Sequence, residues 1–315
     1  MLGLSVSGSV ASMSSTVALS FFFFKVVSSK KGEMTEPYTT PSYYHCIEDN
    51  RYRDSVYEPE ADTFLFLDAI DKETDFIKSR LQQPFAVVEI GCGSGTVITH
   101  VAAQILKEFR NDIMADHPVA LKGGFYAVDV NPMALEAAGK TWDDTMNQYF
   151  SNVLSAMTNP PATLSTRPLM LNHDGGLSSS PFCLTLLEGS LFLPFARFEQ
   201  KFDCILFNPP YVPTSLEELN DAIHKKDPIT AAWCGGPRGR VVLDQFLAIL
   251  PAVLAETGAC YIVLIKENDV EEVKEYIQAC FQNARGTTEK VVEVTCVAER
   301  YTGEHLSVHR ITYIQ

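Results

Sequence analysis

The segment best able to do chemistry is Asn208-Pro-Pro-Tyr211, which directly follows an apolar run from Phe202 to Phe207. Its two prolines have fixed φ angles and no N–H group, so the loop is stiff and its carbonyl groups are free to accept. The Asn208 side-chain oxygen and the Pro209 carbonyl can each accept a hydrogen bond from one N–H of an NH₂ group. Tyr211 offers an aromatic face for stacking. The loop therefore suits a planar amide or amine nitrogen.

A second candidate is the glycine-rich turn within Val88-Glu-Ile-Gly-Cys-Gly-Ser-Gly95, between an apolar run and a segment with helical periodicity. Glycine lets a ligand approach the backbone and allows positive φ angles, here at Gly91, Gly93 and Gly95. Dinucleotide-binding folds use a similar turn, but with the spacing G-x-G-x-x-G. Here the spacing is G-x-G-x-G, and Glu89 precedes the first glycine by two residues. A carboxylate there would repel a pyrophosphate but suits the ammonium of a methionine moiety.

Polar side chains also follow the next two apolar runs. One run ends in Asp129, whose carboxylate could accept hydrogen bonds from both hydroxyl groups of a ribose. Asp129 could also cap the helix that begins near Pro132, just after Asn131, and the two roles are compatible. The other run leads into Ser190 and Leu191, where a polar side chain is expected to meet an adenine ring.

Together these residues predict methyl transfer from S-adenosylmethionine to nitrogen. The glycine turn and Asp129 would hold the donor, and the proline loop would aim the nitrogen lone pair at the methyl group. Alignment of this kind can lower a barrier by as much as about 7–11 kcal/mol, and we find no histidine placed as a general base. Each motif alone also fits an ordinary turn after a core strand, but their order favours the reaction. The predicted catalytic residues are Asn208, Pro209, Pro210 and Tyr211.

The elements that position these motifs alternate along the chain. Apolar runs predict strands at residues 85–90, 125–129, 182–187, 202–207 and 259–265. Helical patterns occur at residues 64–81, 96–109, 132–140, 243–255 and 270–279. Such alternation predicts an α/β fold with a parallel sheet covered on both faces. Two further extended runs, 291–297 and 306–314, predict an antiparallel hairpin at one edge.

The domain organisation follows from composition. Residues 1–50 are rich in Ser, Thr and Tyr without a period, so we expect a disordered tail before one domain at 51–315. Within the tail, Val17 to Val27 is too short to span a bilayer, and no positive residue precedes it as in a signal peptide. We favour a disordered leader or a mis-called start for this stretch over a cryptic targeting segment or anchor. Residues 141–180 are rich in Asn, Ser, Thr and Pro and predict an inserted loop.

Charge and cysteine content exclude several classes of function. The 315-residue chain is 46% hydrophobic, which is ample for a buried core. Its formal charge of −14, from 25 basic and 39 acidic residues, argues against binding a long nucleic-acid backbone but allows a protein substrate with a basic patch. None of the eight cysteines forms a C-x-x-C pair, so we expect no metal site. Reduced cysteines in apolar runs favour the cytoplasm or nucleus, without membrane association.

The motifs taken together resemble class I methyltransferases, and the full set is similar to the HemK branch, which methylates the glutamine of the Gly-Gly-Gln motif in peptide-chain release factors. Val56-Tyr-Glu-Pro-Glu-Ala-Asp-Thr-Phe64 is similar to the start of eukaryotic and archaeal HemK-like members, V-Y-E-P-x-E-D-T-F. Ala231-Ala-Trp-Cys-Gly-Gly-Pro-Arg-Gly-Arg240 is similar to their A-A-W-x-G-G-x-x-G-R stretch, and Lys266-Glu-Asn268 also matches. The resemblance covers about residues 54–314.

This resemblance implies a doubly wound, seven-stranded sheet of order 3-2-1-4-5-7-6 and N5-methylation of a release-factor glutamine by the catalytic subunit of a heterodimer. It also implies a small zinc-binding activator subunit, which would cover the edge strand Phe182 to Leu187 by strand addition unless the insertion at 141–180 covers it. The residues expected to bind S-adenosylmethionine, in part from their types and in part from the resemblance, are Thr63, Glu89, Gly91, Gly93, Gly95, Asp129, Asn131, Ser190, Leu191 and Asn208.

The chain departs from the family pattern at three places, and three other functions fit parts of the sequence. Ala61 stands where Glu is common, with Glu60 beside it; Ser190 stands where Asp or Asn is usual; and the insertion is atypical. An adenine-N6 methyltransferase also uses Asn-Pro-Pro-Tyr, but the negative charge disfavours it. A histone-lysine methyltransferase fits the same motifs. A non-catalytic scaffold, which Ala61 and Ser190 would favour, is the alternative from another class.

Overall fold

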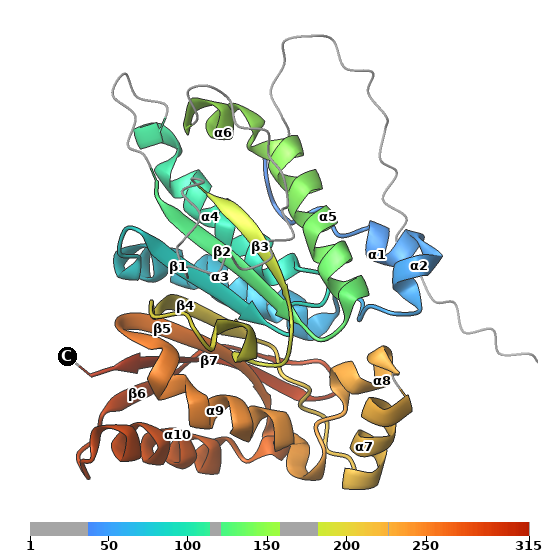
Figure 1. Cartoon of the computed structure of the whole chain (residues 1–315), viewed down its shortest axis with the longest axis vertical. Helices are drawn as coiled ribbons and strands as arrows, with labels where there is room; N and C mark the ends of the chain where they lie inside the picture. The colour runs from blue at the N-terminus through green and yellow to red at the C-terminus, as the bar shows by residue number, and fades with distance from the viewer. Residues whose placement is uncertain (1–36, 114–120, 158–181, 226, 315) are drawn as a thin grey trace, which may run out of the picture. The chain divides into compact units, whose positions relative to one another are not determined.

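The fold centres on a seven-stranded sheet with helices on both faces, in a computed structural model that describes residues 37–113, 121–157, 182–225 and 227–314 (Figure 1). The strand order is β3-β2-β1-β4-β5-β7-β6. β7 pairs antiparallel with both β5 and β6, whereas the other neighbours pair in parallel. The predicted fold class, strand order and terminal hairpin are therefore confirmed. The strands are β1 (Phe85–Ile90), β2 (Gly123–Asp129), β3 (Cys183–Glu188), β4 (Phe202–Phe207), β5 (Leu254–Ile265), β6 (Val292–Tyr301) and β7 (His305–Tyr313).

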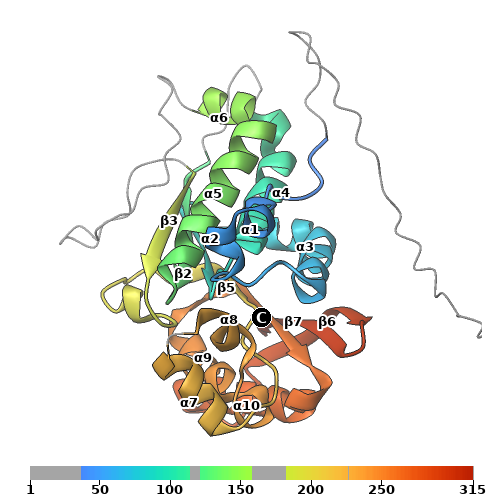
Figure 2. The same cartoon turned by 90° about the vertical axis from the view of Figure 1, so that its right-hand side faces the viewer.

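Helices cover both faces because alternate side chains of each strand point to opposite sides. Phe85 and Val87 of β1 pack in one core with α3, α4 and α5, and Ala86 and Val88 pack in a second core with α9 and α10. The two groups of helices lie on opposite sides of the strands (Figure 2). The helices are α1 (His45–Glu48), α2 (Asn50–Arg53), α3 (Ala61–Arg80), α4 (Thr96–Ile113), α5 (Pro132–Tyr149), α6 (Ser151–Met157), α7 (Leu216–Lys225), α8 (Pro228–Trp233), α9 (Val241–Val253) and α10 (Val270–Arg285), with short 3-10 turns η1 (Leu193–Phe195), η2 (Pro237–Gly239) and η3 (Lys266–Asn268).

The predicted insertion begins too early. α5 continues to Tyr149 and α6 follows it, where we expected a loop from residue 141. The helix persists because its hydroxyl-bearing residues are buried and bonded: Thr141 Oγ1 donates to the Ser94 carbonyl at 2.7 Å, and Thr145 Oγ1 donates to the Thr141 carbonyl at 2.6 Å. The remainder of the insertion, residues 158–180, lies outside the described residues.

The predicted tail ends too late. Residues 37–56, which we call the N-terminal strap, fold onto α5, with Cys46 and Tyr52 buried against Ala134 and Ala137. His45 Nε2 donates to the Ala137 carbonyl at 3.1 Å. The apolar stretch at 17–27 lies outside the described residues. Within the residues that the structure does describe, none of the helices is long and apolar enough to cross a membrane. The expected cytoplasmic or nuclear location stays a prediction.

Candidate active site

The carboxyl ends of four neighbouring parallel strands bring the predicted site residues to one edge of the sheet. Ile90 of β1 lies beside Val128 of β2 and Phe207 of β4, and Asp129 lies beside Glu188 of β3. The glycine turn, Asp129, the Ser190 segment and the proline loop each begin at these ends. Open α/β sheets bind their ligands at this edge, so the topology assembles the two predicted halves of the site.

The three glycines of the turn have positive φ angles but serve different ends. Gly91, Gly93 and Gly95 have φ values of +62°, +49° and +70°. A Cβ atom on Gly95 would lie 2.6 Å from Ala138 Cα, so this glycine allows α4 and α5 to approach each other. A Cβ on Gly93 would meet no atom within 4 Å among the described residues. Gly93 therefore borders open space, as a ligand-binding turn requires.

Asp129 connects the glycine turn to the end of β2. Its Oδ2 accepts from the Gly93 N–H at 3.0 Å, and its Oδ1 accepts from the Asn131 N–H at 2.8 Å. Burial raises the pKa of this carboxyl. The cap of α5 is Asn131, whose side chain accepts from the Met133 N–H at 3.0 Å and donates to the Ser55 carbonyl at 2.6 Å. The capping role weighed for Asp129 thus belongs to Asn131, which also fastens the N-terminal strap beside the site.

Glu89 is a buried acid next to Asp129. Its side chain is 3% exposed, and Oε2 accepts from the Ile98 N–H at 3.0 Å in the first turn of α4. Burial raises the pKa of Glu89 well above the usual range, and the nearby Asp129 charge raises it further. Two acids held close together at low solvent exposure favour a bound positive charge, because a cation would offset both desolvation and mutual repulsion.

The acceptor loop is held by an acid that the sequence reasoning did not single out. Asp62, in the first turn of α3, is 4% exposed. Its Oδ2 accepts from Asn208 Nδ2 at 2.8 Å and from Tyr211 Oη at 3.2 Å, while Oδ1 accepts from the Thr63 N–H at 2.7 Å. Burial, followed by the Asp62 charge, raises the pKa of Tyr211, so this phenol stays a hydrogen-bond donor. The sequence feature that could have identified Asp62 is a carboxylate among apolar residues at the start of a helix.

The decisive atom of the loop is the side-chain oxygen of Asn208. It is buried and accepts no hydrogen bond from the residues that the structure describes. Because Asp62 binds the Asn208 nitrogen, the amide is oriented with its oxygen as the free acceptor. Leaving a buried acceptor unpaired costs about 1–3 kcal/mol, so such a group in a native fold calls for an explanation. A ligand N–H supplies one.

The Ser190 segment is also at the predicted edge, although its geometry is less complete. The Gly189 N–H donates to the Asp129 carbonyl at 2.9 Å, which fixes the segment against β2. Ser190 is exposed, and Leu191 has a φ of +50°, an uncommon conformation for a residue with a branched side chain. Residues in such conformations are often found beside ligands.

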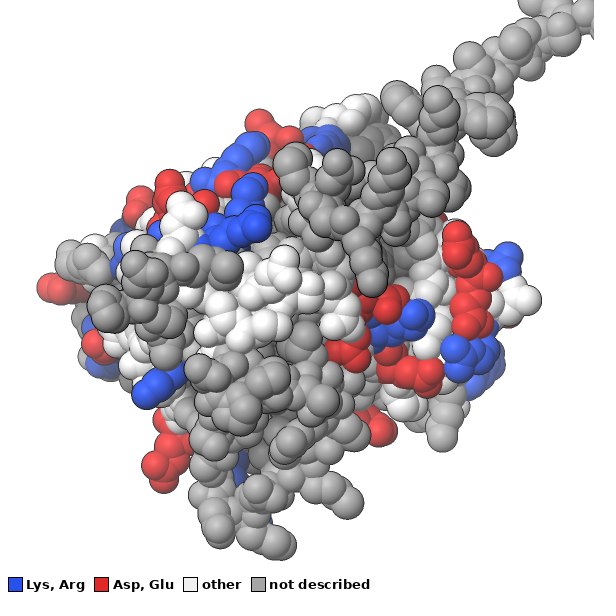
Figure 3. Space-filling model, turned by 90° about the horizontal axis from the view of Figure 1, so that it is seen from above, with Lys and Arg blue, Asp and Glu red and all other residues white. Residues whose placement is uncertain are grey.

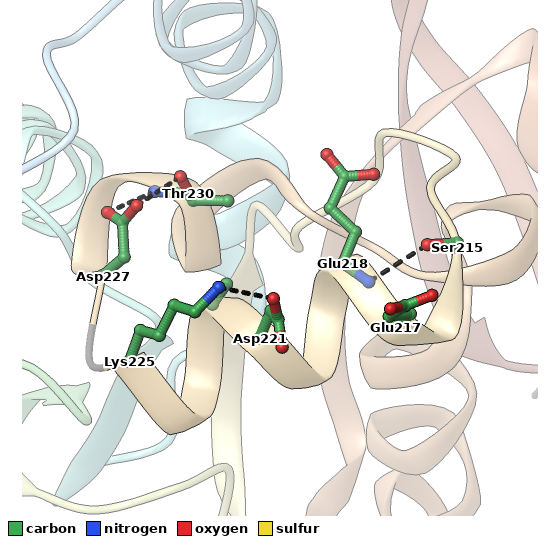
Figure 4. A pocket seen from close by; sticks show the side chains of 8 residues that line it. Ser215, Glu217, Glu218, Asp221, Lys225, Asp227 and Thr230 are labelled. Carbon is green, nitrogen blue, oxygen red and sulfur yellow. Dashed lines mark hydrogen bonds and ion pairs between the residues drawn. The ribbon is translucent and has the colours of Figure 1, made fainter.

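A pocket lies between α7 and α8, elements that the sequence did not lead us to expect (Figure 4). Polar side chains line most of it, and internal bonds join several of them, such as Lys225 to Asp221 and Thr230 to Asp227. In the described ranges, no three His, Cys, Asp or Glu side chains gather as they would around a metal ion. On the face seen in Figure 3, basic and acidic side chains lie intermingled, as on an ordinary solvated surface.

Comparison with known proteins identifies the family. No family model matches the chain. The mouse (Mus musculus) protein "Methyltransferase HEMK2" is 32% identical over 249 residues, which cover 79% of this chain and 88% of the relative. The Schizosaccharomyces pombe "eRF1 methyltransferase catalytic subunit mtq2" is 27% identical over 224 residues, 71% of this chain and 78% of the relative. The solved Mtq2–Trm112 complex of E. cuniculi aligns with 82% of this chain and 98% of its own, at 20% identity and a TM-score of 0.43. The chain belongs to the HEMK2 family of methyltransferases.

Proposed function

We propose that the protein transfers the methyl group of S-adenosylmethionine to the side-chain nitrogen of the glutamine in the Gly-Gly-Gln motif of a eukaryotic release factor. The observation that carries this proposal is the buried, unpaired Asn208 oxygen, an acceptor that matches an amide N–H. The relatives support the substrate class, since one is named an eRF1 methyltransferase and an archaeal one, from Methanocaldococcus jannaschii, a putative protein N5-glutamine methyltransferase.

The donor half of the site fits S-adenosylmethionine. The turn at Gly93 borders open space, and the paired acids Glu89 and Asp129 favour a positively charged ligand. Asp129 would accept from the ribose, the segment at Ser190 and Leu191 would border the adenine, and Thr63, Gly91, Gly95 and Asn131 would shape the surrounding wall. When bound, this cofactor supplies a methyl group activated by a sulfonium.

In the acceptor half, this chain's residues bind and orient the glutamine amide. The Asn208 oxygen and the Pro209 carbonyl would each accept one amide N–H, and the stiff Pro209-Pro210 pair keeps both acceptors in place. Asp62 fixes the amide of Asn208 and the phenol of Tyr211 at the same carboxylate oxygen. The ring of Tyr211 would stack on the planar amide. The nitrogen gains the methyl group and releases one proton, so alignment rather than a strong base provides the rate enhancement.

The acceptor is tested by methyl incorporation into three classes of substrate. With labelled donor, we expect incorporation into release factor, and none into a release factor whose motif reads Gly-Gly-Ala. DNA and histone serve as the other acceptors, because adenine and lysine are the alternatives that the loop also fits. Incorporation into DNA or histone, with none into release factor, would disprove the proposed substrate.

We also propose that a small zinc-binding activator subunit covers the edge strand β3, over residues 182–187. Among the described strands β3 pairs with β2 alone, so it is the edge strand of the described sheet, the place where another chain can add a strand. The S. pombe relative is named a catalytic subunit, which supports an assembly with another chain. Co-expression with a candidate activator tests the idea: we expect higher soluble yield and a stable complex. A monomer that is fully soluble and active alone would contradict it.

A further inference from the structure

A fully buried asparagine contacts the main chain of the acceptor loop, whereas Asp62 contacts its side chains. Asn268, in η3 directly after β5, is 0% exposed. Its Oδ1 accepts from the Ile265 N–H at 2.9 Å, and its Nδ2 donates to the carbonyls of Tyr211 and Arg238, each at 2.9 Å. These partners fix the orientation of the amide, because an N–H needs an acceptor and the two carbonyls need a donor.

The segment next to Asn268 is built for close contact with the same carbonyl. Gly239 has a φ of +66°, and a Cβ atom added to it would lie 1.8 Å from the Tyr211 oxygen and 2.6 Å from Asn268 Nδ2. Gly235 is similar, since its Cβ would lie 2.5 Å from the Pro210 oxygen. The two glycines thus let η2 lie directly against the main chain of the acceptor loop.

Ion pairs hold this segment in a strained conformation. Arg238 has a φ of +61°, which costs free energy for a residue with a side chain. Its guanidinium binds Glu272 of α10 at 2.7 Å, and Arg240, 6% exposed, binds the same carboxylate at 3.0 Å. η2 is therefore fastened to α10 on one side and, through Asn268, to the acceptor loop on the other.

The loop depends on such a fastening because of its own sequence. Pro209 and Pro210 have no N–H group, so they cannot donate main-chain hydrogen bonds that would tie the loop to the fold. Main-chain hydrogen bonds with Trp233 and Gly235 hold the chain at Val212, and Asn268 adds a contact one residue closer to the prolines, at the Tyr211 carbonyl. Asp62 holds only the side chains of Asn208 and Tyr211.

We propose that Asn268 is a positioning residue for methyl transfer, which fixes the main chain at Tyr211 and thereby the direction of the Asn208 oxygen. This inference rests on the proposed function of the acceptor loop. Asn268 would contact neither substrate nor cofactor, so its loss should slow the transfer step without weakening donor binding.

The test is the near-isosteric substitution Asn268→Asp, in the full chain with its activator if one is required. The carboxylate keeps an acceptor for Ile265 but places a second acceptor against two carbonyls. We expect kcat to fall about tenfold to a hundredfold, as for a displacement of about 1 Å near the reacting atoms, with the donor Kd changed less than about twofold. Asn283→Asp, an exposed change of the same charge on α10, is the matched control and should leave kcat unchanged.

Hydrogen exchange at the amides of Tyr211, Val212 and Thr214 gives a second readout that needs no methyl acceptor. We expect faster exchange there in Asn268→Asp, with exchange in β1 and α4 unchanged, even if wild-type protein methylates no glutamine. The milder Asn268→Ser is measured in parallel and should show the same pattern with smaller effects. Unchanged kcat and exchange would overturn the inference, and so would a loss of donor binding that accompanies the loss of kcat in both variants, since that assigns Asn268 to general stability.

Discussion

Replacing Asp62 with asparagine is the sharpest test of the proposed acceptor site. The four groups bonded to the Asp62 carboxylate are all donors: Asn208 Nδ2, Tyr211 Oη, and the N–H and hydroxyl groups of Thr63. In Asp62→Asn one oxygen becomes an NH₂ group. If that group faces Asn208, donor meets donor and the Asn208 amide must turn, which points its own NH₂ group at the substrate.

The magnitude follows from the bonds lost. A hydrogen bond that involves a charged group contributes about 1.5–3 kcal/mol. The glutamine nitrogen gains positive charge as it takes the methyl group, so losing the orientation of Asn208 removes at least one such bond in the transition state. A barrier raised by that amount lowers the rate about 10- to 150-fold. The donor Kd should change less than about threefold, because Asp62 bonds to neither the glycine turn nor Asp129. A tenfold change in Kd would require a change of about 1.4 kcal/mol in the free energy of donor binding.

The assay is single-turnover methyl transfer to release factor at saturating donor, with donor affinity measured by calorimetry. Asp75→Asn, an exposed acid on the same helix α3, provides the control and should behave as wild type. A kcat for Asp62→Asn within twofold of wild type would refute the argument that this carboxylate orients the acceptor loop.

Three further outcomes are expected. Asn208→Ala removes the unpaired oxygen and should lower kcat more than about a hundredfold while donor binding persists. The control Asn220→Ala, at an exposed position, should leave kcat unchanged. Near-normal turnover of Asn208→Ala would argue against the proposed loop chemistry. Burial raises the pKa of Glu89, so donor binding should release protons and weaken as pH falls below that raised pKa; calorimetric heats that do not depend on the buffer's ionisation enthalpy would contradict this. Burial lowers the pKa of His309 from 6.5 to about 4, so this imidazole takes up a proton less readily in the folded state than in the unfolded chain. The free energy of unfolding should therefore fall by about 3 kcal/mol as the pH falls from 6.5 to 4. Urea unfolding at pH 7 and pH 4.5 measures this loss of stability, which should be smaller in His309→Phe than in the wild type. An equal loss in both proteins would show that His309 does not cause it.

The scaffold was predictable where local pattern and burial coincide. β1 and β4 are central strands that are buried along their whole length, and their apolar runs end in Gly91 and Asn208, so their bounds could be predicted to the residue. The helix α5 was predicted too short because Thr141 and Thr145 are poor helix formers, and their burial depends on tertiary contacts. The short helix α7 has five charged or histidine side chains beside four apolar ones, with only Leu219 and Ala222 buried, and it was not expected.

The site was predictable in its motifs but not in the contacts between them. Each motif lies at a strand end, and parallel strands bring such ends together, so the positions of Asp129 and Asn208 followed from the fold class. Asp62 reaches Asn208 across 146 residues, and Asn268 reaches Tyr211 across 57. No local periodicity encodes such contacts. The residues that orient the acceptor loop therefore became visible only in three dimensions.

The position of β7 within the sheet also determines when a newly made chain can complete that sheet. β7 enters between β5 and β6, although it follows both in the sequence, so one edge of β5 stays unpaired until residues 305–313 have been synthesised. Arg310 of β7 also binds Glu73 of α3, the helix that carries Asp62. A nascent chain that has reached β5 would thus possess the strands that end at the proposed donor site but lack the Arg310 contact to α3. Late, long-range pairing of this kind is slow and leaves an edge of the sheet open, so we expect the unfinished chain to be prone to aggregate.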